Sequence, residues 1–90
     1  MSAGDLLALV KLNLSIANTA YDSYLTQLIE TAEQLIAREG ISLTDTAEDN
    51  SLIVMYAAYL FRKRAEDSPQ MPRMLRYALN NRLFSEKVSG

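Results

Sequence analysis

The strongest pattern in the chain is an uninterrupted apolar stretch over residues 52–61, which reads Leu-Ile-Val-Met-Tyr-Ala-Ala-Tyr-Leu-Phe. On a helix of about 100° per residue its apolar groups cover every side, which is typical of a helix inside a core or a membrane. A membrane span needs roughly 20 such residues, whereas this stretch is shorter and ends at a run of cations, Arg62, Lys63 and Arg64. We therefore predict a buried central helix that begins after a polar lead-in at residues 46–49 and ends near Ala65.

The start of the chain predicts a short helix over residues 3–12. Ser2 can cap this helix, with Asp5 three residues later as its capping-box partner. The apolar side chains of this helix that share one side are Leu6, Leu9 and Val10. Residues 13–19 are polar and broken, so we predict a loop there, held by Leu14 and Ile16.

A long second helix is predicted to begin after Asn18 or Thr19 and to end near Glu39. Its apolar residues recur with helical spacing and form a single stripe, Leu25, Leu28, Ile29, Ala32, Leu35 and Ile36. Gly40 suits the left-handed position that stops a helix. Residues 41–46 then form a connection, and either Thr44 or Thr46 caps the central helix.

The C-terminal part predicts a fourth helix that begins between Pro69 and Pro72 and ends near Phe84. Proline is tolerated in a first helical turn because the N–H groups there are unpaired in any case. The inner stripe of this helix is Met71, Leu75, Ala78, Leu79 and Leu83. Residues 85–90 are polar, and we expect a flexible tail there. The fold class is therefore all-α, a single four-helix domain over residues 1–90 in which amphipathic helices enclose the central apolar one.

Composition excludes several kinds of chemistry. The 90 residues contain no cysteine and no histidine, so the chain has neither a disulfide framework nor the commonest general base and transition-metal ligand. The acids Asp45, Glu48 and Asp49 lack the spacing of a calcium loop, and we interpret them as complements to the dipole of the central helix. We predict no enzymatic activity, no cofactor and no metal. The first residues do not resemble a signal peptide, so we expect a cytoplasmic protein.

The net charge of −2 hides an asymmetry between the two halves of the chain. Residues 1–50 contain two basic and eight acidic residues, whereas residues 51–90 contain seven basic and three acidic ones. Such a division can mean a basic face for nucleic acid, or it can mean that the acidic part of one copy meets the basic part of the next. For the second case we expect Arg62, Arg64, Arg73 and Arg76 to face the acids of the long helix in a neighbouring copy, including Glu30 and Glu33.

Two exposed features remain open to more than one interpretation. The run Arg62-Lys63-Arg64 can complete the C-terminus of the central helix, contact a partner or bind nucleic acid. Tyr77 and Phe84 fall on the side of the fourth helix opposite its inner stripe. They are either ordinary exposed aromatics or part of a contact surface, where aromatic residues are enriched.

The order of these elements resembles the gp6-like head–tail connector family of tailed bacteriophages and prophages. Members commonly read "D..L..LI..A...I" in the long helix, and this chain matches at Asp22, Leu25, Leu28, Ile29, Ala32 and Ile36. The next helix in the family is bulky, apolar and closed by aromatic and basic residues, matched here by Leu52, Ala57, Tyr59, Leu60 and Arg62. The resemblance extends from about residue 4 to residue 83. The loop after the first helix is less acidic than is usual in the family, and the connection at residues 41–46 is short.

The resemblance implies a structural protein of the virion, assembled in the host cytoplasm. Copies would form a homo-oligomeric ring, dodecameric in the virion, beneath the portal protein. The ring would join the head to a tail or head-closure protein, and DNA would pass through its channel without sequence-specific binding. No membrane contact is implied. Because the C-terminal part of similar connectors reaches toward the portal, we expect Tyr77 and Phe84 to contact it. The alternative function is a small helical DNA-binding regulator that uses the basic C-terminal half.

Overall fold

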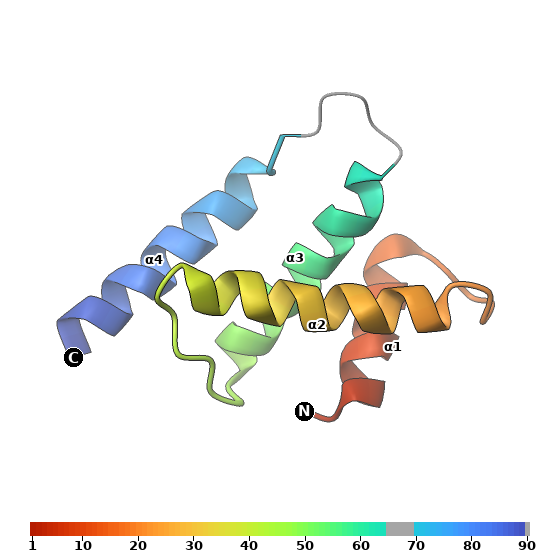
Figure 1. Ribbon diagram of the computed structural model, residues 1–90, viewed down its shortest axis with the longest axis horizontal. Coiled ribbons are helices and arrows are strands. Elements are labelled where there is room, and N and C mark those ends of the chain that lie inside the picture. Colours follow the sequence, from red (N-terminus) through yellow and green to blue (C-terminus); the bar gives the residue numbers. More distant parts are fainter. Residues whose placement is uncertain (65–69, 90) are drawn as a thin grey trace.

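The computed structural model describes residues 1–64 and 70–89, and over these residues the chain forms four helices. They are α1 (Ala3–Leu14), α2 (Asp22–Arg38), α3 (Ala47–Lys63) and α4 (Arg73–Ser89). α1 and α4 flank α3 on opposite sides, and α2 crosses in front of α3 (Figure 1). The molecule measures 41 × 32 × 18 Å, so its shortest dimension is close to two helix diameters of about 10 Å. The predicted all-α fold with a central apolar helix is confirmed.

Local sequence signals account for most helix ends. The Ser2 hydroxyl accepts a hydrogen bond from the Asp5 N–H, and the Asp5 carboxylate accepts one from the Ser2 N–H. Thr46, rather than Thr44, caps α3 by accepting from the Asp49 N–H. Gly40 follows the end of α2 with φ at +101°, the left-handed conformation that was predicted to stop this helix.

The first helix is longer than predicted. α1 includes Asn13 and ends at Leu14, and its C-cap is Ser15, whose φ of 59° is left-handed. The Ser15 N–H then donates to the Leu12 carbonyl. The prediction that the loop starts at residue 13 was therefore wrong, because Ser15 performs the terminating role usually taken by glycine or asparagine.

The ends of α4 also differ from the prediction. The helix begins at Arg73, directly after Pro72, whose carbonyl accepts from the Arg76 N–H. It does not end near Phe84 but continues to Ser89, so residues 85–89, which were predicted to form a flexible tail, belong to the helix. The reason is Glu86, which accepts from the Ser42 N–H over 2.6 Å and so attaches the last turns of α4 to the α2–α3 connection. The predicted end of α3 at Ala65 lies outside the described residues, and α3 ends at Lys63.

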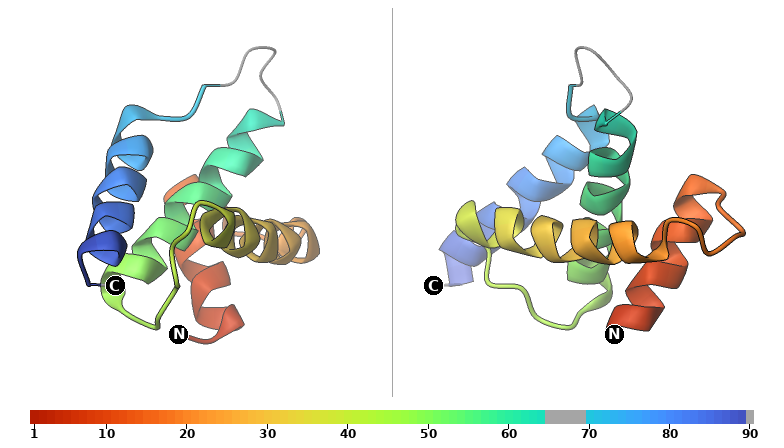
Figure 2. Two further views of the ribbon diagram at one scale, coloured as in Figure 1. Left: turned by 60° about the vertical axis from the view of Figure 1, so that its left-hand side comes forward. Right: turned by 45° about the vertical axis from the view of Figure 1, so that its right-hand side comes forward.

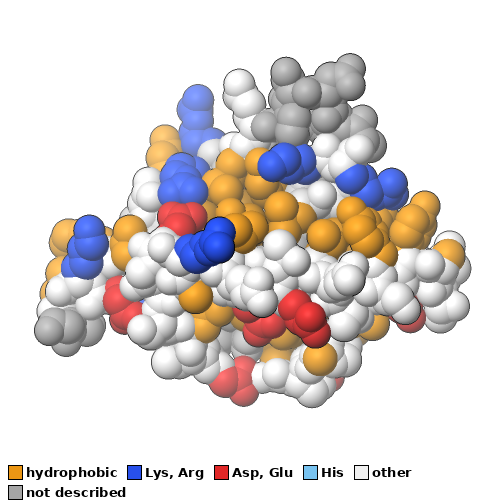
Figure 3. All heavy atoms as spheres, viewed as in Figure 1, with side chains coloured by type: hydrophobic (Ala, Val, Ile, Leu, Met, Phe, Trp, Pro, Cys, Tyr) orange, Lys and Arg blue, Asp and Glu red, His pale blue; other side chains and the backbone are white. Residues whose placement is uncertain are grey.

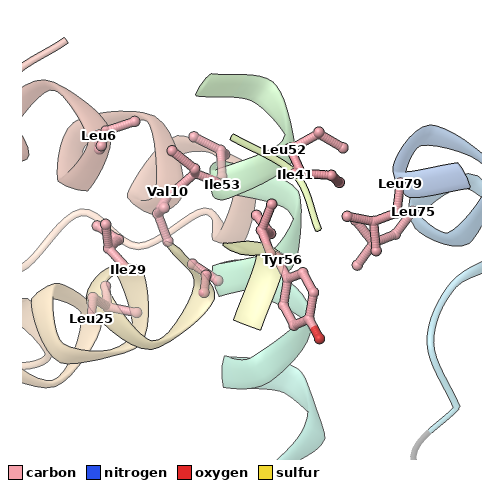
Figure 4. Close-up of a cluster of buried hydrophobic side chains, with 14 residues drawn as sticks. Leu6, Val10, Leu25, Ile29, Ile41, Leu52, Ile53, Tyr56, Leu75 and Leu79 are labelled. Carbon is pink, nitrogen blue, oxygen red and sulfur yellow. The ribbon is translucent and has the colours of Figure 1, made fainter. Parts of the chain in front are cut away.

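The hydrophobic core lies on two sides of α3. On one side α3 packs against α1 and α2, and on the other it packs against α4 and the segment after α2 (Figure 4). The residues labelled in that view from the first group are Leu6, Val10, Leu25, Ile29 and Ile53, and those from the second are Ile41, Leu52, Leu75 and Leu79. α3 therefore links two packed groups of helices, which explains why its apolar residues do not form a single stripe.

The burial of α3 is not uniform along its length. Tyr56 and Ala57 are buried, as predicted, with 8% and 0% of their surface exposed. Leu60 was predicted to be buried with them but is only partly buried. Figures 1 and 2 show the reason, since the C-terminal part of α3 extends past α2. Over the described residues, none of the helices is both long enough and apolar enough to cross a membrane.

Candidate interaction surfaces

A buried ion pair holds α4 against the rest of the domain. Arg82 donates from Nε to Asp49 Oδ1 over 2.7 Å and from Nη2 to the Ser42 carbonyl over 2.8 Å. The backbone N–H and the hydroxyl of Thr44 both donate to Asp49 Oδ2. Asp49 is fully buried and Arg82 is 9% exposed. These contacts attach α4 to the start of α3 and to the α2–α3 connection.

The two charges of this pair stabilise each other. Burial alone would raise the pKa of Asp49, but the hydrogen bonds from Arg82 and Thr44 outweigh burial and lower the pKa of that carboxyl below its ordinary value. The hydrogen bond to Asp49 in turn raises the pKa of Arg82. Both groups are therefore charged across the neutral range.

This ion pair was not predicted from the sequence. We interpreted Asp49 as a complement to the helix dipole and gave Arg82 no role. A signal was present, because Arg82 follows Leu75 and Leu79 at the spacing of the inner stripe of α4. A charged residue on an inner helix face requires a buried partner, and Asp49 is one of the two acids in the first turn of the central helix.

Arg76 is also paired within the chain. Its guanidinium donates from Nη1 and Nη2 to the two carboxylate oxygens of Glu39, over 3.0 and 3.1 Å. This bidentate contact joins α4 to the end of α2. We had expected Arg76 to face acids of a neighbouring copy, and the structure instead gives its charge an intramolecular partner.

The predicted cation cluster at the end of α3 is divided between two environments. Arg62 donates from Nη2 to the backbone carbonyl and the side-chain oxygen of Asn13, and so joins the C-terminal ends of α1 and α3. Arg64 lies over the Phe61 ring, 4.2 Å from its centroid, and 5.2 Å from the centroid of Tyr21. Tyr21 meets Phe61 edge to face at 5.2 Å. Arg64 therefore covers an aromatic cluster between α2 and α3.

A mixed apolar and basic face accompanies this cluster. Figure 3 shows hydrophobic side chains gathered above α2, with Lys and Arg side chains along their upper edge. Tyr21 and Tyr24 are 39% and 38% exposed in this region of the fold. Aromatic residues and arginine are enriched in protein interfaces, so this face is a candidate contact surface.

The outer face of α4 carries four of the eight large hydrophobic side chains that are exposed in the described part of the chain. Four of its large side chains point away from the core, and they are exposed by 78%, 58%, 69% and 69% at Met74, Tyr77, Phe84 and Val88. With the exposed Asn81 they alternate at intervals of three and four residues, which is the spacing of a coiled-coil seam. Tyr77 and Phe84 are thus members of a larger stripe that was not predicted from the sequence. Val88 lies beyond the predicted end of the helix, and Met74 was overlooked within it.

The remaining three residues that were predicted to lie in a subunit interface are on the surface, and they do not form a cluster. Glu30 is exposed and Glu33 is half-buried on α2, and Arg73 is exposed at the first residue of α4. Within the described part of the chain, neither glutamate takes part in an ion pair. The ion pair that α2 makes near its start is instead between Asp22 and Lys11 of α1, at 2.8 Å.

A groove runs between α1 and α3. Its apolar lining comes from Leu9 and Leu12 of α1 and from Val54 and Met55 of α3. Met1 and Asp45 line one end of the groove, and Asn13 of α1 lines it toward the other end, where Arg62 binds Asn13. α1 and α3 therefore run in the same direction along the groove. We did not predict this groove, because three enclosing helices were expected to cover α3 on all sides.

The acids of the described surface are dispersed. Across residues 1–64 and 70–89, no group of three or more acids comes together in a way that could hold a metal ion. The acids near the start of α3 diverge, since Asp49 is buried while Asp45 and Glu48 are exposed.

When the chain is compared with known proteins, no family model, no curated protein and no solved structure matches it.

Proposed function

We propose that this protein is a head–tail connector subunit of a tailed bacteriophage or prophage, a structural protein that forms a ring under the portal protein. The observation that carries the proposal is the outer face of α4, where four large apolar side chains are exposed on one stripe. A contiguous exposed apolar stripe of this kind is typical of a surface that contacts another protein. The resemblance of α2 and α3 to the connector family supplies the identity of the assembly.

The mechanism of a connector is binding energy combined with geometry. A ring requires a heterologous interface, in which two different surfaces of the same chain meet. Once most of a ring is formed, the last contacts are effectively intramolecular, so weak individual contacts give a stable assembly. The buried pair between Asp49 and Arg82 supports this role, because it holds α4 at a fixed position relative to α3 in every copy.

The division of charge also supports self-assembly. The acidic residues are concentrated in the first half of the chain and the basic ones in the second half. Complementary charge across an interface steers association and fixes orientation more than it adds affinity. The partners of the proposed assembly are further copies of the chain, a portal protein, and a tail or head-closure protein.

The proposal is tested by measuring mass in solution. Light scattering after size-exclusion chromatography is run on the protein alone and with a portal protein from the same phage or prophage genome, and rings are sought by electron microscopy. We expect a complex with portal and ring-shaped particles. A protein that stays monomeric and does not bind portal would contradict the proposal. Binding to duplex DNA with a steep dependence on salt would instead support the DNA-binding regulator.

A further inference from the structure

Among the apolar surfaces that the described helices leave uncovered, two lie on opposite sides of α3 (Figure 1). One is the outer face of α4, and the other is the groove between α1 and α3. We propose that the outer face of α4 in one copy occupies the α1–α3 groove of the next copy. This inference rests on the proposed ring-forming function and identifies the interface through which the ring would form.

The α4 stripe is similar in length to α1 and longer than the lined part of α3. The stripe extends from Met74 to Val88, and at 1.5 Å per residue it is about 21 Å long. α1 has 12 residues and is about 18 Å long, and the α3 residues that line the groove, Ala47 to Met55, span about 12 Å by the same rise. α1 and α3 run in the same direction, so the groove between them follows their axes. An amphipathic helix that presents apolar residues at three- and four-residue intervals is the usual occupant of such a groove.

The polar positions of the two surfaces also correspond. Asn81 lies at the middle of the α4 stripe, and Ser51 lies at the middle of the α3 segment that lines the groove. An amide buried in a helix seam needs a hydrogen-bond partner, and it fixes the register of the seam when it has one. Ser51 and its neighbour Asn50 can supply that partner. The apolar rim residue Leu12, which is 75% exposed, would be covered by the same contact.

Charge sets the direction in which α4 would lie. The N-terminal ends of α1 and α3 lie at the same end of the groove, where Asp5 and Glu48 are exposed and Asp45 pairs with the ammonium group of Met1. Lys87 is in the last turn of α4. An antiparallel placement brings Lys87 toward these acids and sets the negative end of the α4 dipole beside two positive helix ends. This orientation is therefore favoured over the parallel one.

Pairing of α4 with a second α4 fits the charges less well. In an antiparallel pair of identical helices, Arg73 of one copy would approach Lys87 of the other, and like charges at such positions are destabilising. α1 and α4 also lie on opposite sides of α3, so a copy cannot fill its own groove (Figures 1 and 2). The proposed contact therefore joins different surfaces of successive copies, which is the arrangement that produces rings or filaments.

Cysteine cross-linking tests this interface directly, because the chain contains no cysteine of its own. Leu12→Cys and Met74→Cys are made as separate single variants, mixed and oxidised. In the antiparallel placement Met74 lies near the Leu12 end of the groove, so we expect a disulfide-linked dimer in the mixture. A mixture of Leu12→Cys with Val88→Cys is the matched control, since Val88 would lie at the far end. Circular dichroism verifies that each variant is folded.

Each other outcome overturns the inference. Cross-linking of Met74→Cys with itself would indicate α4–α4 pairing, equal yields from the two mixtures would indicate random collision, and no cross-linked dimer would exclude the contact. The function is judged separately by portal binding. Portal binding and rings without the expected cross-link would remove this interface and leave the connector proposal in place. The expected cross-link without portal binding would keep the interface and remove the connector.

Discussion

Arg82 donates from Nε to Oδ1 of the buried Asp49 over 2.7 Å, and this contact determines where α4 lies. Two residues that are 33 positions apart in the chain thereby join α4 to the first turn of α3. The outer face of α4 can act as a contact surface only because its inner face is held in this way. The stability of the pair is therefore the first property to test.

Removing either member of the pair should destabilise the fold strongly. Asp49→Leu leaves the largely buried Arg82 guanidinium with its longer ion pair to Glu86, at 3.4 Å, and breaking a buried pair costs about 3–5 kcal/mol. Arg82→Leu should have a similar cost because it leaves Asp49 charged and buried. The double variant, Asp49→Leu with Arg82→Leu, should recover much of this loss. Urea denaturation followed by circular dichroism measures the free energy of unfolding of the two single variants and of the double variant.

Arg38→Leu is the matched control, since Arg38 is an exposed arginine on α2. It should change the free energy of unfolding by no more than about 0.5 kcal/mol. If the double variant loses as much free energy of unfolding as the two single variants together, Asp49 and Arg82 do not stabilise each other. The pair would then not be what holds α4 in place.

Acid should weaken the fold through the same carboxylate. The pKa of Asp49 in the folded state lies below its ordinary value of 3.8. The stabilisation that it provides is therefore fully present above about pH 4, and it is lost as the pH falls through the folded-state pKa. The pKa of Glu86 is also lowered, by its hydrogen bonds with Ser42, and it contributes in the same direction. Stability should thus be nearly flat from pH 7 to pH 5 and fall toward pH 3.

Asp49→Asn isolates the contribution of this residue. The variant has no carboxylate at position 49, so its free energy of unfolding should be lower at pH 7 and should fall less between pH 5 and pH 3 than that of the native protein. Denaturation curves recorded at pH 7, 5 and 3 give the comparison. Parallel pH profiles for the two proteins would show that Asp49 is not responsible for the acid sensitivity.

The two leucines of α3 should respond differently to truncation. Leu52 is 1% exposed, so Leu52→Ala should cost about 2–5 kcal/mol through loss of apolar burial and the cavity left behind. Leu60 is only partly buried, and Leu60→Ala should cost roughly 1 kcal/mol. Chemical denaturation of both variants measures the two losses in free energy of unfolding, which can then be compared. A larger loss for Leu60→Ala would mean that the C-terminal part of α3 is covered in solution.

The sequence predicted the helices well because their signals are local. The capping box at Ser2, the stripe of α2, the glycine stop at Gly40 and the cap at Thr46 each depend on residues within one or two turns. The end of α1 was misplaced for a local reason, the left-handed conformation of Ser15, and two further errors came where distant residues decide the outcome. Glu86 extends α4 by binding Ser42, and Asp49 is buried because Arg82 reaches it across the fold. Neither partner can be identified from periodicity alone.

The candidate surfaces were predictable only in part. Tyr77 and Phe84 were assigned to an outward face, and both are exposed. The groove between α1 and α3 could not be predicted, because an apolar stretch without a polar side suggested that α3 was covered all round. The flat arrangement explains the difference, since three helices cannot enclose a fourth completely when two of them lie beside it and one crosses in front.

Two arginines of α4 should separate assembly from folding. Arg73 is exposed at the start of the helix, so Arg73→Glu should leave stability nearly unchanged while reducing self-association if charge steers the contact. Arg76 pairs with Glu39, and Arg76→Glu should cost roughly 1 kcal/mol of stability because the pair is half-exposed. Denaturation and light scattering on both variants distinguish the two roles. Equal self-association of native protein and Arg73→Glu at low and high salt would exclude electrostatic steering.

The aromatic residues of the α4 stripe should dominate its binding. Tyr77→Ala combined with Phe84→Ala removes two large exposed rings, and truncation of such anchors commonly costs 1–2 kcal/mol or more each. Self-association should therefore weaken by at least about tenfold, while the helical content stays unchanged because both side chains lie outside the core. Asn80→Ala with Ser85→Ala serves as the control, since both residues are exposed on the same helix.

Measuring portal binding on the same double variant decides which partner uses the stripe. If α4 occupies the groove of a neighbouring copy, self-association should fall while the affinity of a single subunit for portal is retained. If the stripe contacts portal instead, portal affinity should fall and self-association should persist. Native values for both quantities would show that this face of α4 has no part in assembly, and the exposed apolar stripe would then no longer support a connector function.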